Sequence, residues 1–311
     1  MRIVVTGALG FVASHLVDKL ISLGHEVLGI DDLSNGYVQN RNEEANYIIG
    51  DVTLLAQEHI ERLLNFKPET VYHLACYPRS ISFKNPERDM IVNLGSTISL
   101  CNLAIEEKFR FVFSSNSGLI RQPRYLPLDE HHPVHPLTPY DAHKLASEHI
   151  LRAYSEAYGQ TATVLRFASV YGPRQRPNPT LGWNPLIPTW INQIRNPQPR
   201  ITLEGTGEQT RDFVYVSDVV EALVHCIDFN TGFHGPYLIA SGQETSLTNL
   251  LQKLGSRLGY PTIDYKPKKV GDIPAMSYNI SLAGEELKWQ PKVMLDEGLR
   301  DTINWWMENE K

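Results

Sequence analysis

The sequence predicts an α/β protein built on a doubly wound parallel sheet, with a smaller mixed α/β lobe in the C-terminal half. Short apolar runs alternate with helical stretches, a glycine turn follows the first run, and a proline-rich segment ends the alternation. Apolar runs too short for helices, alternating with stretches long enough to be helices, are typical of repeated β-α-β units. Helices then cover both faces of the sheet, so its strands read as continuous apolar runs.

The expected elements follow one another along the first half of the chain. Each strand is a short apolar run, and each helix is a longer stretch whose apolar residues recur at helical spacing. Strands are expected at residues 2–5, 27–30, 47–49, 70–73, 109–113 and 162–167. The clearest helices are expected at residues 11–22, 93–107 and 139–158.

The pattern changes after Tyr171. Residues 172–188 hold five prolines, and a long irregular segment of this kind is usually functional or disordered. The remainder mixes short strands and helices without regular alternation. We therefore expect a first domain over residues 1–170, which also includes about 210–240, and a second, discontinuous lobe over residues 171–311.

Composition and charge limit the kinds of molecule that the protein is expected to bind. The 311 residues include 29 Lys and Arg against 35 Asp and Glu, a net charge of −6, which disfavours nucleic acids and anionic membranes as partners. No apolar stretch approaches the roughly 18 residues that span a bilayer, and we expect a cytoplasmic protein. Cys76, Cys101 and Cys226 form no Cys-x-x-Cys pair, so we expect neither a disulfide framework nor a metal site.

A strand that runs into Gly7 and a helix that opens near Gly10 form a turn suited to a pyrophosphate. A side chain at either glycine would block its approach, and the N-terminus of the helix offers unpaired N–H groups and a positive dipole end. Asp31 ends the second strand about 20 residues later, where a carboxylate accepts the ribose hydroxyls of an adenosine. It would repel a 2′-phosphate, so the sequence predicts NAD rather than NADP.

A tyrosine and a lysine lie four residues apart at the start of the helix expected over residues 139–158. This spacing places Lys144 beside Tyr140 on one helical face. A phenol with a pKa near 10 is a poor base at neutral pH. A neighbouring ammonium and a bound cationic nicotinamide would stabilise the phenolate and lower the pKa of Tyr140. Tyr140 would then take a proton from a substrate hydroxyl while hydride leaves the same carbon.

Together these residues resemble the extended short-chain dehydrogenase/reductase family, and within it the nucleotide-sugar epimerases and dehydratases. The resemblance covers nearly the whole chain, and its most specific motif is residues 205–214, which contain Arg211 and Asp212. It implies a Rossmann fold, NAD as cofactor and a nucleotide-sugar substrate. By analogy with similar proteins, it also implies a homodimer that pairs the helices over residues 93–107 and 139–158.

The resemblance also implies a set of cofactor-binding residues along the ends of the strands. They are Gly7, Gly10, Phe11, Val12, Asp31, Asp32, Ser34, Asn35, Asp51, Val52, Leu74, Ala75, Cys76, Asn93, Ser114, Tyr140, Lys144, Phe167 and Val170. Among them, Asp51 is similar to the residue that meets the adenine amino group, and Asn93 to the asparagine that supports the site.

A second set of residues is implied for the substrate. They are Ser169, Leu186, Glu204, Arg211, Lys269 and Asp272. In the family the arginine at the position of Arg211 holds the substrate diphosphate, which suits a guanidinium because it pairs phosphate in a bidentate fork. UDP is the first choice of nucleotide. Glu204 stands where an aromatic residue often stacks on the base, so CDP and GDP stay open.

The catalytic residues implied are Tyr140 and Lys144, with Asn116 or Ser115 as their partner. Asn116 stands where the family usually carries a serine or threonine. An asparagine can donate a hydrogen bond to a C4 oxygen, but it cannot relay a proton as a hydroxyl does. Ser115 or Ser117 supplies the hydroxyl if the loop is shifted.

The next two positions separate the activities within the family. In similar proteins the 4,6-dehydratases carry Asp-Glu there and the decarboxylases carry a glutamate, whereas this chain has Ser117 and Gly118. We therefore predict an NAD-dependent epimerase that inverts C4 of a UDP-sugar through a transient 4-keto intermediate. The alternatives are a nucleotide-sugar oxidoreductase or decarboxylase that uses the same Tyr–Lys pair, and a catalytically silent NAD-binding protein.

Overall fold

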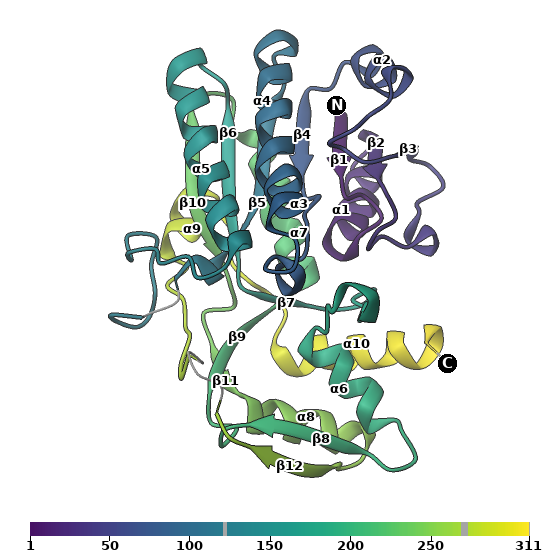
Figure 1. Cartoon of the computed structure of the whole chain (residues 1–311), viewed down its shortest axis with the longest axis vertical. Helices are drawn as coiled ribbons and strands as arrows, with labels where there is room; N and C mark the ends of the chain where they lie inside the picture. The colour runs from purple at the N-terminus through teal and green to yellow at the C-terminus, as the bar shows by residue number, and fades with distance from the viewer. Residues whose placement is uncertain (121–122, 269–272, 311) are drawn as a thin grey trace.

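The computed structural model describes residues 1–120, 123–268 and 273–310, and its central feature is a seven-stranded parallel sheet (Figure 1). Its strands are β1 (Arg2–Thr6), β2 (Glu26–Asp31), β3 (Asn46–Ile49), β4 (Thr70–His73), β5 (Arg110–Asn116), β6 (Ala162–Phe167) and β10 (Phe233–Ile239). They lie in the order β10-β6-β5-β4-β1-β2-β3, and every neighbouring pair is parallel. The predicted doubly wound sheet is confirmed, and its order reverses between β1 and β4, where such sheets bind ligands.

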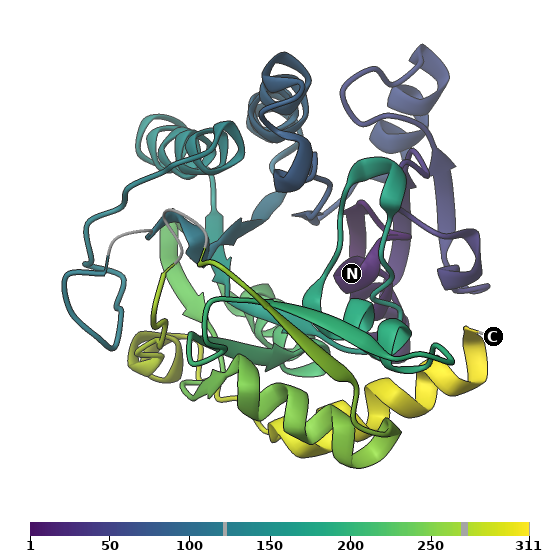
Figure 2. The ribbon, with the colours of Figure 1, turned by 60° about the horizontal axis from the view of Figure 1, so that its bottom comes forward.

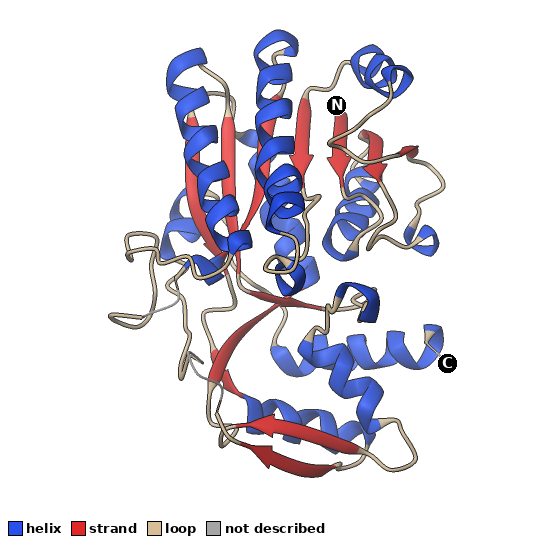
Figure 3. Ribbon diagram, in the orientation of Figure 1, coloured by secondary structure: helices blue, strands red, loops and turns tan. Residues whose placement is uncertain are grey.

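Helices cover both faces of this sheet (Figure 3). Ile3 and Val5 of β1 pack into one apolar cluster, whereas Val4 points the other way and packs into a second cluster. The first cluster lies under α1 (Phe11–Ser22), α7 (Val216–His225) and α9 (Ser281–Glu286). The second lies under α2 (Gln57–Phe66), α4 (Ser96–Glu107) and α5 (Pro139–Tyr158), and α3 (Pro86–Met90) packs on α5. Burial on both faces explains why these strands are apolar at successive positions.

Some element boundaries differ from those predicted. The strand expected at residues 109–113 begins at Arg110 and continues to Asn116, which brings three polar residues into the sheet. The helix expected at residues 93–107 begins with a π-helical turn, η3 (Ile91–Gly95), and Asn93 lies in that turn. β10 was not predicted as a strand, because its turn-forming Gly235-Pro236 interrupts the apolar run. Through α7 and β10, residues 216–239 pack with the first half of the chain.

A smaller lobe lies beyond the carboxyl ends of the strands (Figures 1 and 2). One of its sheets joins β7 (Ser169–Tyr171), β9 (Thr210–Tyr215) and β11 (Glu244–Ser246), and the other pairs β8 (Arg200–Glu204) with β12 (Thr262–Lys266). Its helices are α6 (Leu186–Ile194), α8 (Leu247–Leu258) and α10 (Leu295–Asn309). Trp190, Leu254 and Trp306 are buried in its core. Within the described ranges, no helix combines the length and apolar character needed to cross a bilayer.

A buried ion pair fastens α5 to β6. Arg166 donates from Nε and Nη2 to the two carboxylate oxygens of Glu148 at 2.9 and 2.6 Å. The Ser115 hydroxyl donates to the same carboxylate at 2.5 Å. Only 5% and 6% of the Arg166 and Glu148 side chains are exposed. A carboxylate buried so deeply depends on its partners for compensation of its charge.

We expect Arg166→Met to lower the free energy of unfolding by about 3–5 kcal/mol, because it leaves Glu148 charged and unpaired in the interior. Urea denaturation followed by circular dichroism measures the change. The double variant Arg166→Met with Glu148→Leu serves as the matched control and should regain most of the loss, since an apolar pair has no charge to desolvate. A single variant within about 1 kcal/mol of the parent protein would contradict this account.

Candidate active site

A cavity of about 310 Å³ opens at the carboxyl ends of β1, β2, β4 and β5, where the strand order reverses. Seventeen of the residues predicted for cofactor or catalysis line it. They are Gly7, Gly10, Phe11, Val12, Asp31, Asp32, Ser34, Asn35, Asp51, Val52, Leu74, Ala75, Cys76, Ser114, Ser115, Tyr140 and Phe167. The sequence patterns therefore converge on one site in space.

Nine further residues of the lining were not singled out as ligands from the sequence. They are Ala13, Ile30, Gly50, Tyr77, Pro78, Arg88, Val92, Leu181 and Trp183. Ala13, Ile30 and Gly50 adjoin predicted motifs, so the same patterns could have found them. Leu181 and Trp183 lie in the proline-rich segment, and no sequence signal places them at the ends of the strands.

The turn after β1 requires glycine at its first position. Gly7 has φ of +68°, and a Cβ atom there would lie 2.9 Å from both N and Cα of Ala75. Only a residue without a side chain allows this turn to pass so close to the end of β4. The Gly10 N–H donates to the Gly7 carbonyl at 2.9 Å, and α1 begins at the next residue. The N-terminus of α1, at Phe11 and Val12, therefore lines the cavity with a positive dipole end that suits a pyrophosphate.

Asp31 is held against the glycine turn. Its carboxylate accepts the Leu9 N–H at 2.9 Å and the Leu33 N–H at 2.8 Å. Burial raises the pKa of Asp31, and these two hydrogen bonds oppose the rise. Each oxygen keeps a further lone pair for the ribose hydroxyls of an adenosine, because a carboxylate offers about four acceptor positions.

Asp51 lies at the opposite wall of the same cavity. Its carboxylate accepts hydrogen bonds from the backbone and side chain of Thr53 at 2.8 and 2.7 Å, and it pairs with Arg88 of α3. Burial alone would raise the pKa of Asp51, but the hydrogen bonds from Thr53 and Arg88 outweigh it and lower the pKa. Arg88 thus keeps an anion in place where an adenine amino group would need an acceptor.

The Tyr–Lys pair begins α5, which Thr138 caps by accepting the Asp141 N–H at 3.1 Å. Lys144 is fully buried and donates to the Ser114 carbonyl at 2.9 Å. Its Nζ lies 4.4 Å from the ring centre of Phe113 and 5.9 Å from that of Tyr140. Tyr140 lines the cavity, so the expected adjacency of amine and phenol is present.

Burial dominates both groups of this pair in the protein without its cofactor. Burial raises the pKa of Tyr140 well above its ordinary value, and burial also lowers the pKa of Lys144. Desolvation disfavours the charged form of both groups. The lowered pKa expected at Tyr140 with a bound nicotinamide stays a prediction, because a cation in the cavity would act against these shifts.

Three polar residues follow one another at the end of β5. Ser115 lines the cavity, and its hydroxyl donates a hydrogen bond to Glu148. Ser117 accepts a hydrogen bond from the buried Tyr278 hydroxyl at 2.8 Å. The amide nitrogen of Asn116 is buried, and within the described part of the chain it has no hydrogen-bond partner. Asn116 thus keeps an unused donor, as a contact to a substrate oxygen would require.

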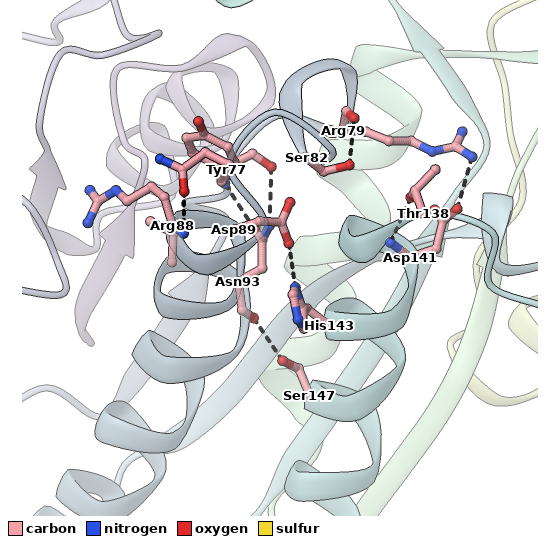
Figure 4. A network of polar contacts seen from close by, with 12 residues as sticks. Tyr77, Arg79, Ser82, Arg88, Asp89, Asn93, Thr138, Asp141, His143 and Ser147 are labelled. Carbon is pink, nitrogen blue, oxygen red and sulfur yellow. Dashed lines mark hydrogen bonds and ion pairs between the residues drawn. The ribbon is translucent and has the colours of Figure 1, made fainter.

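Four of the residues predicted for cofactor or catalysis do not line the cavity: Asn93, Asn116, Lys144 and Val170. Lys144 contacts the lining residue Ser114, and Asn116 follows the lining residue Ser115. Asn93 is buried and supports the cavity from behind. Its side-chain oxygen accepts the Tyr77 N–H at 3.0 Å, and its amide donates to the Tyr77 carbonyl at 3.2 Å (Figure 4). It fixes the loop after β4, which forms one wall.

The residues predicted for the substrate lie in the smaller lobe, outside this cavity. Ser169 is exposed on β7, Leu186 begins α6 and Glu204 ends β8. Arg211, on β9, donates to the Thr210 and Ile273 carbonyls at 2.7 and 2.9 Å. Lys269 and Asp272 lie outside the described residues.

The proline-rich segment runs past the N-terminal elements (Figure 2). Arg174 pairs with Asp18 of α1 at 2.7 Å. Asn178 donates to the Asn35 side chain at 3.0 Å, beside the cavity. The segment is therefore anchored to the loop that follows β2, where the adenosine end of a dinucleotide would lie.

Arg176 makes the largest set of contacts in this segment. Its guanidinium lies 4.7 Å from the ring centres of both Tyr37 and Trp305, and it pairs with Glu310. It also donates to the Asn40 side chain at 3.2 Å. These contacts join the last helix of the smaller lobe to the loop after β2, so Arg176 links the two lobes.

Known proteins share this arrangement. The sequence pattern of the NAD dependent epimerase/dehydratase family matches residues 3–240. The chain belongs to this family. The predicted resemblance and the choice of NAD as cofactor are confirmed at this level. A UDP-glucose 4-epimerase of Mycolicibacterium smegmatis is 33% identical over 97% of each chain.

Solved structures of two epimerases superpose on the whole chain. The structure of a Thermotoga maritima UDP-glucose 4-epimerase with UDP-glucose has a TM-score of 0.91 and 34% identity, and the match covers 100% of both chains. The Thermus thermophilus UDP-glucose 4-epimerase in complex with NAD has a TM-score of 0.87 and 29% identity, with 99% of this chain and 100% of the other covered.

We expect NAD to protect Cys76 from alkylation. Cys76 is exposed and lines the cavity, whereas Cys101 and Cys226 are buried. In protein stripped of nucleotide, iodoacetamide should label Cys76 alone, and NAD at about 100 times its Kd should slow labelling by about 100-fold. Peptide mass spectrometry measures the rate, with the two buried cysteines as internal controls. Equal rates with and without NAD would show that the cofactor binds elsewhere.

Proposed function

We propose that this protein is an NAD-dependent epimerase that inverts C4 of a UDP-sugar. One observation carries the proposal: the tyrosine paired with a buried lysine lines the same cavity as the glycine turn and Asp31. The relatives named UDP-glucose 4-epimerase support it. Glu204, where a base would stack, leaves CDP and GDP as less favoured nucleotides.

The residues of the chain divide the chemistry between them. Tyr140 takes the proton of the C4 hydroxyl and later returns it. Lys144 neutralises the developing phenolate and fixes the end of β5 through Ser114. Asn116 offers its free amide donor to the C4 oxygen, in place of a hydroxyl. Bound in this cavity, NAD would supply the acceptor for the hydride from C4 of the sugar and, once reduced, the donor that returns it to the other face.

The site residues of the smaller lobe complete the proposal. Arg211 would bind the substrate diphosphate, with Ser169, Leu186 and Glu204 around the nucleotide. Lys269 and Asp272 are proposed for the same role from the sequence. We also propose the domain division at residue 170. Of the stretch 210–240 expected to return to the first domain, α7 and β10 do so, whereas β9 (Thr210–Tyr215) joins a sheet of the smaller lobe. A cytoplasmic location stays a prediction.

The principal alternative is a net oxidoreductase or decarboxylase that uses the same pair. Elimination and decarboxylation in similar proteins use a carboxylate directly after the serine or threonine position. Ser117 and Gly118 stand there, and Ser117 is engaged by Tyr278. Epimerisation needs one acid–base group and a cofactor regenerated in place, which fits the residues present.

Incubation of the protein with UDP-glucose and no added cofactor should produce the C4 epimer of UDP-glucose without a net change in absorbance at 340 nm. Tyr140→Phe should lower turnover by at least about 100-fold, because it removes the only atom that moves the proton. The variant should keep bound NAD, measured by mass spectrometry after denaturation. Proton NMR of the sugar anomeric signals follows the reaction. Near-normal turnover in Tyr140→Phe would refute the role of this residue.

Each alternative gives a different result when UDP-glucuronic acid is tested beside UDP-glucose under the same conditions. An oxidoreductase stalls after one turnover and leaves reduced cofactor. A decarboxylase consumes UDP-glucuronic acid and releases carbon dioxide. A silent binding protein retains NAD and converts no nucleotide sugar.

We further propose a homodimer that pairs α4 and α5 with their copies. These helices lie side by side on one face (Figure 1). Apolar side chains are exposed beside them: Phe83, Met90, Ile91 and Leu137 are 70%, 46%, 43% and 46% exposed. A patch of exposed apolar side chains of this kind marks an interaction surface.

Light scattering should therefore give twice the chain mass of 35.2 kDa. Ile91→Asp should shift the protein to monomer, because it puts a charge into the apolar contact. Tyr265→Asp is the matched control: Tyr265 is 61% exposed on β12 of the smaller lobe, and its variant should stay dimeric. A parent protein that is monomeric at micromolar concentration would contradict the proposal.

A further inference from the structure

The turn of α5 that carries Tyr140 and Lys144 is held by two carboxylate contacts, one with an arginine and one with a histidine (Figure 4). Asp141 accepts from Arg79 Nη2 at 2.9 Å. His143 Nδ1 lies 2.6 Å from Asp89 Oδ1. Asp141 follows Tyr140 directly, and His143 precedes Lys144 directly. Both contacts therefore act within the single helical turn that joins the phenol to the amine.

Both partners of α5 come from the segment that forms the wall of the cavity. Arg79 follows the lining residues Tyr77 and Pro78, and Asp89 lies on α3. Farther along α5, Ser147 donates to the Asn93 carbonyl at 2.8 Å, and Asn93 in turn holds Tyr77. The wall and the helix are thus joined at three successive points, which fixes the position of Tyr140 relative to the cavity.

These contacts place buried charge next to the phenol. The carboxylates of Asp89 and Asp141 are both 0% exposed. The second oxygen of Asp89 has no hydrogen-bond partner within the described residues, so its charge is only partly compensated. Arg79 is partly exposed and supplies the cation that pairs with Asp141. Charges in such surroundings act on a neighbouring titratable group more strongly than they do in water.

We propose that Arg79 and Asp89 are positioning residues that hold the catalytic turn of α5 and set the charge balance around Tyr140. The inference rests on the proposed role of Tyr140 as the acid–base group. It assigns to this loop and helix a function that the motifs at residues 140 and 144 do not reveal.

The charged and titratable groups around Tyr140 come from three elements. The loop after β4 contributes Cys76 and Arg79, α3 contributes Asp89, and α5 contributes Asp141, His143 and Lys144. After burial, the thiol of Cys76 and the carboxylates of Asp141 and Asp89 raise the pKa of Tyr140, whereas Arg79 lowers it. Removal of the Asp89 charge and removal of the Arg79 charge should therefore shift the pKa of Tyr140 in opposite directions.

The test measures the titration of Tyr140 in the full-length, NAD-loaded protein. Tyrosine labelled with ¹³C at Cζ gives one signal that is missing from Tyr140→Phe, and its chemical shift follows ionisation. Asp89→Asn keeps a hydrogen bond to His143 and removes the carboxylate charge. It should therefore lower the titration midpoint of Tyr140 by on the order of one pH unit. Arg79→Met should raise the midpoint by a similar amount, because it removes a cation.

Two variants serve as matched controls. Arg79→Lys keeps the charge and should leave the midpoint near that of the parent protein. Asp264→Asn removes the partner of Arg200 in the smaller lobe, far from α5 in the fold, and should have no effect. If Arg79→Met does not fold, Arg79→Gln takes its place, since it keeps part of the side-chain packing.

Opposite shifts in Asp89→Asn and Arg79→Met support the proposal, and any other pattern overturns it. Shifts in the same direction would mean that both variants merely loosen the helix. The titration needs no turnover, so it stands even if the protein does not convert UDP-glucose. Where the protein is active, the midpoint of the pH profile of kcat should shift in the same direction as the pKa of Tyr140. The KM of each variant should stay within about threefold of that of the parent protein.

Discussion

The close crossing of the turn after β1 over the end of β4 is the contact on which the site depends. Gly7 brings the two backbones together, and the Ala75 N–H then donates to the Thr6 hydroxyl at 3.1 Å. This crossing points the N-terminus of α1 into the crevice and aligns the loop after β4 along its other side. A side chain at Gly7 would separate the two walls, because its Cβ would meet backbone atoms that cannot rotate away.

Beneath the cavity the chain uses neutral hydrogen bonds to hold these walls. His73 bridges Thr6 and Ser96, at 2.7 Å through Nδ1 and 2.9 Å through Nε2. Burial lowers the pKa of His73 to about 3, so the ring is neutral and acts as one donor and one acceptor. Charged groups are instead placed around α5, where Glu148 and Asp89 act on Lys144 and Asp141 acts on Tyr140. The polar interior is thus divided into a neutral support under the dinucleotide and a charged support behind the acid–base pair.

The sequence predicted those parts of the site that local chemistry determines. A positive φ and a close backbone approach require glycine at Gly7, a ribose needs an acceptor such as Asp31, and helical spacing alone brings Tyr140 and Lys144 together. Parts that depend on long-range packing were not predictable in this way. Arg88 reaches Asp51 only because α3 folds against the sheet, and Trp183 reaches the cavity only because Asn178 and Arg176 anchor its segment. β10 was missed because a Gly-Pro pair normally signals a turn, whereas here the sheet edge tolerates it at a register shift.

The environment of Tyr140 favours the neutral phenol in the protein without its cofactor. Burial, the Cys76 thiol and two nearby carboxylates raise the pKa of Tyr140, and burial also lowers the pKa of Lys144. A further cation in the cavity would act in the opposite direction, because it favours the phenolate. Oxidised nicotinamide would supply that cation and reduced nicotinamide would not. In the proposed mechanism Tyr140 would therefore be a better base while a hydride acceptor is present and a better acid once the hydride has been transferred, which is the order that an epimerisation requires.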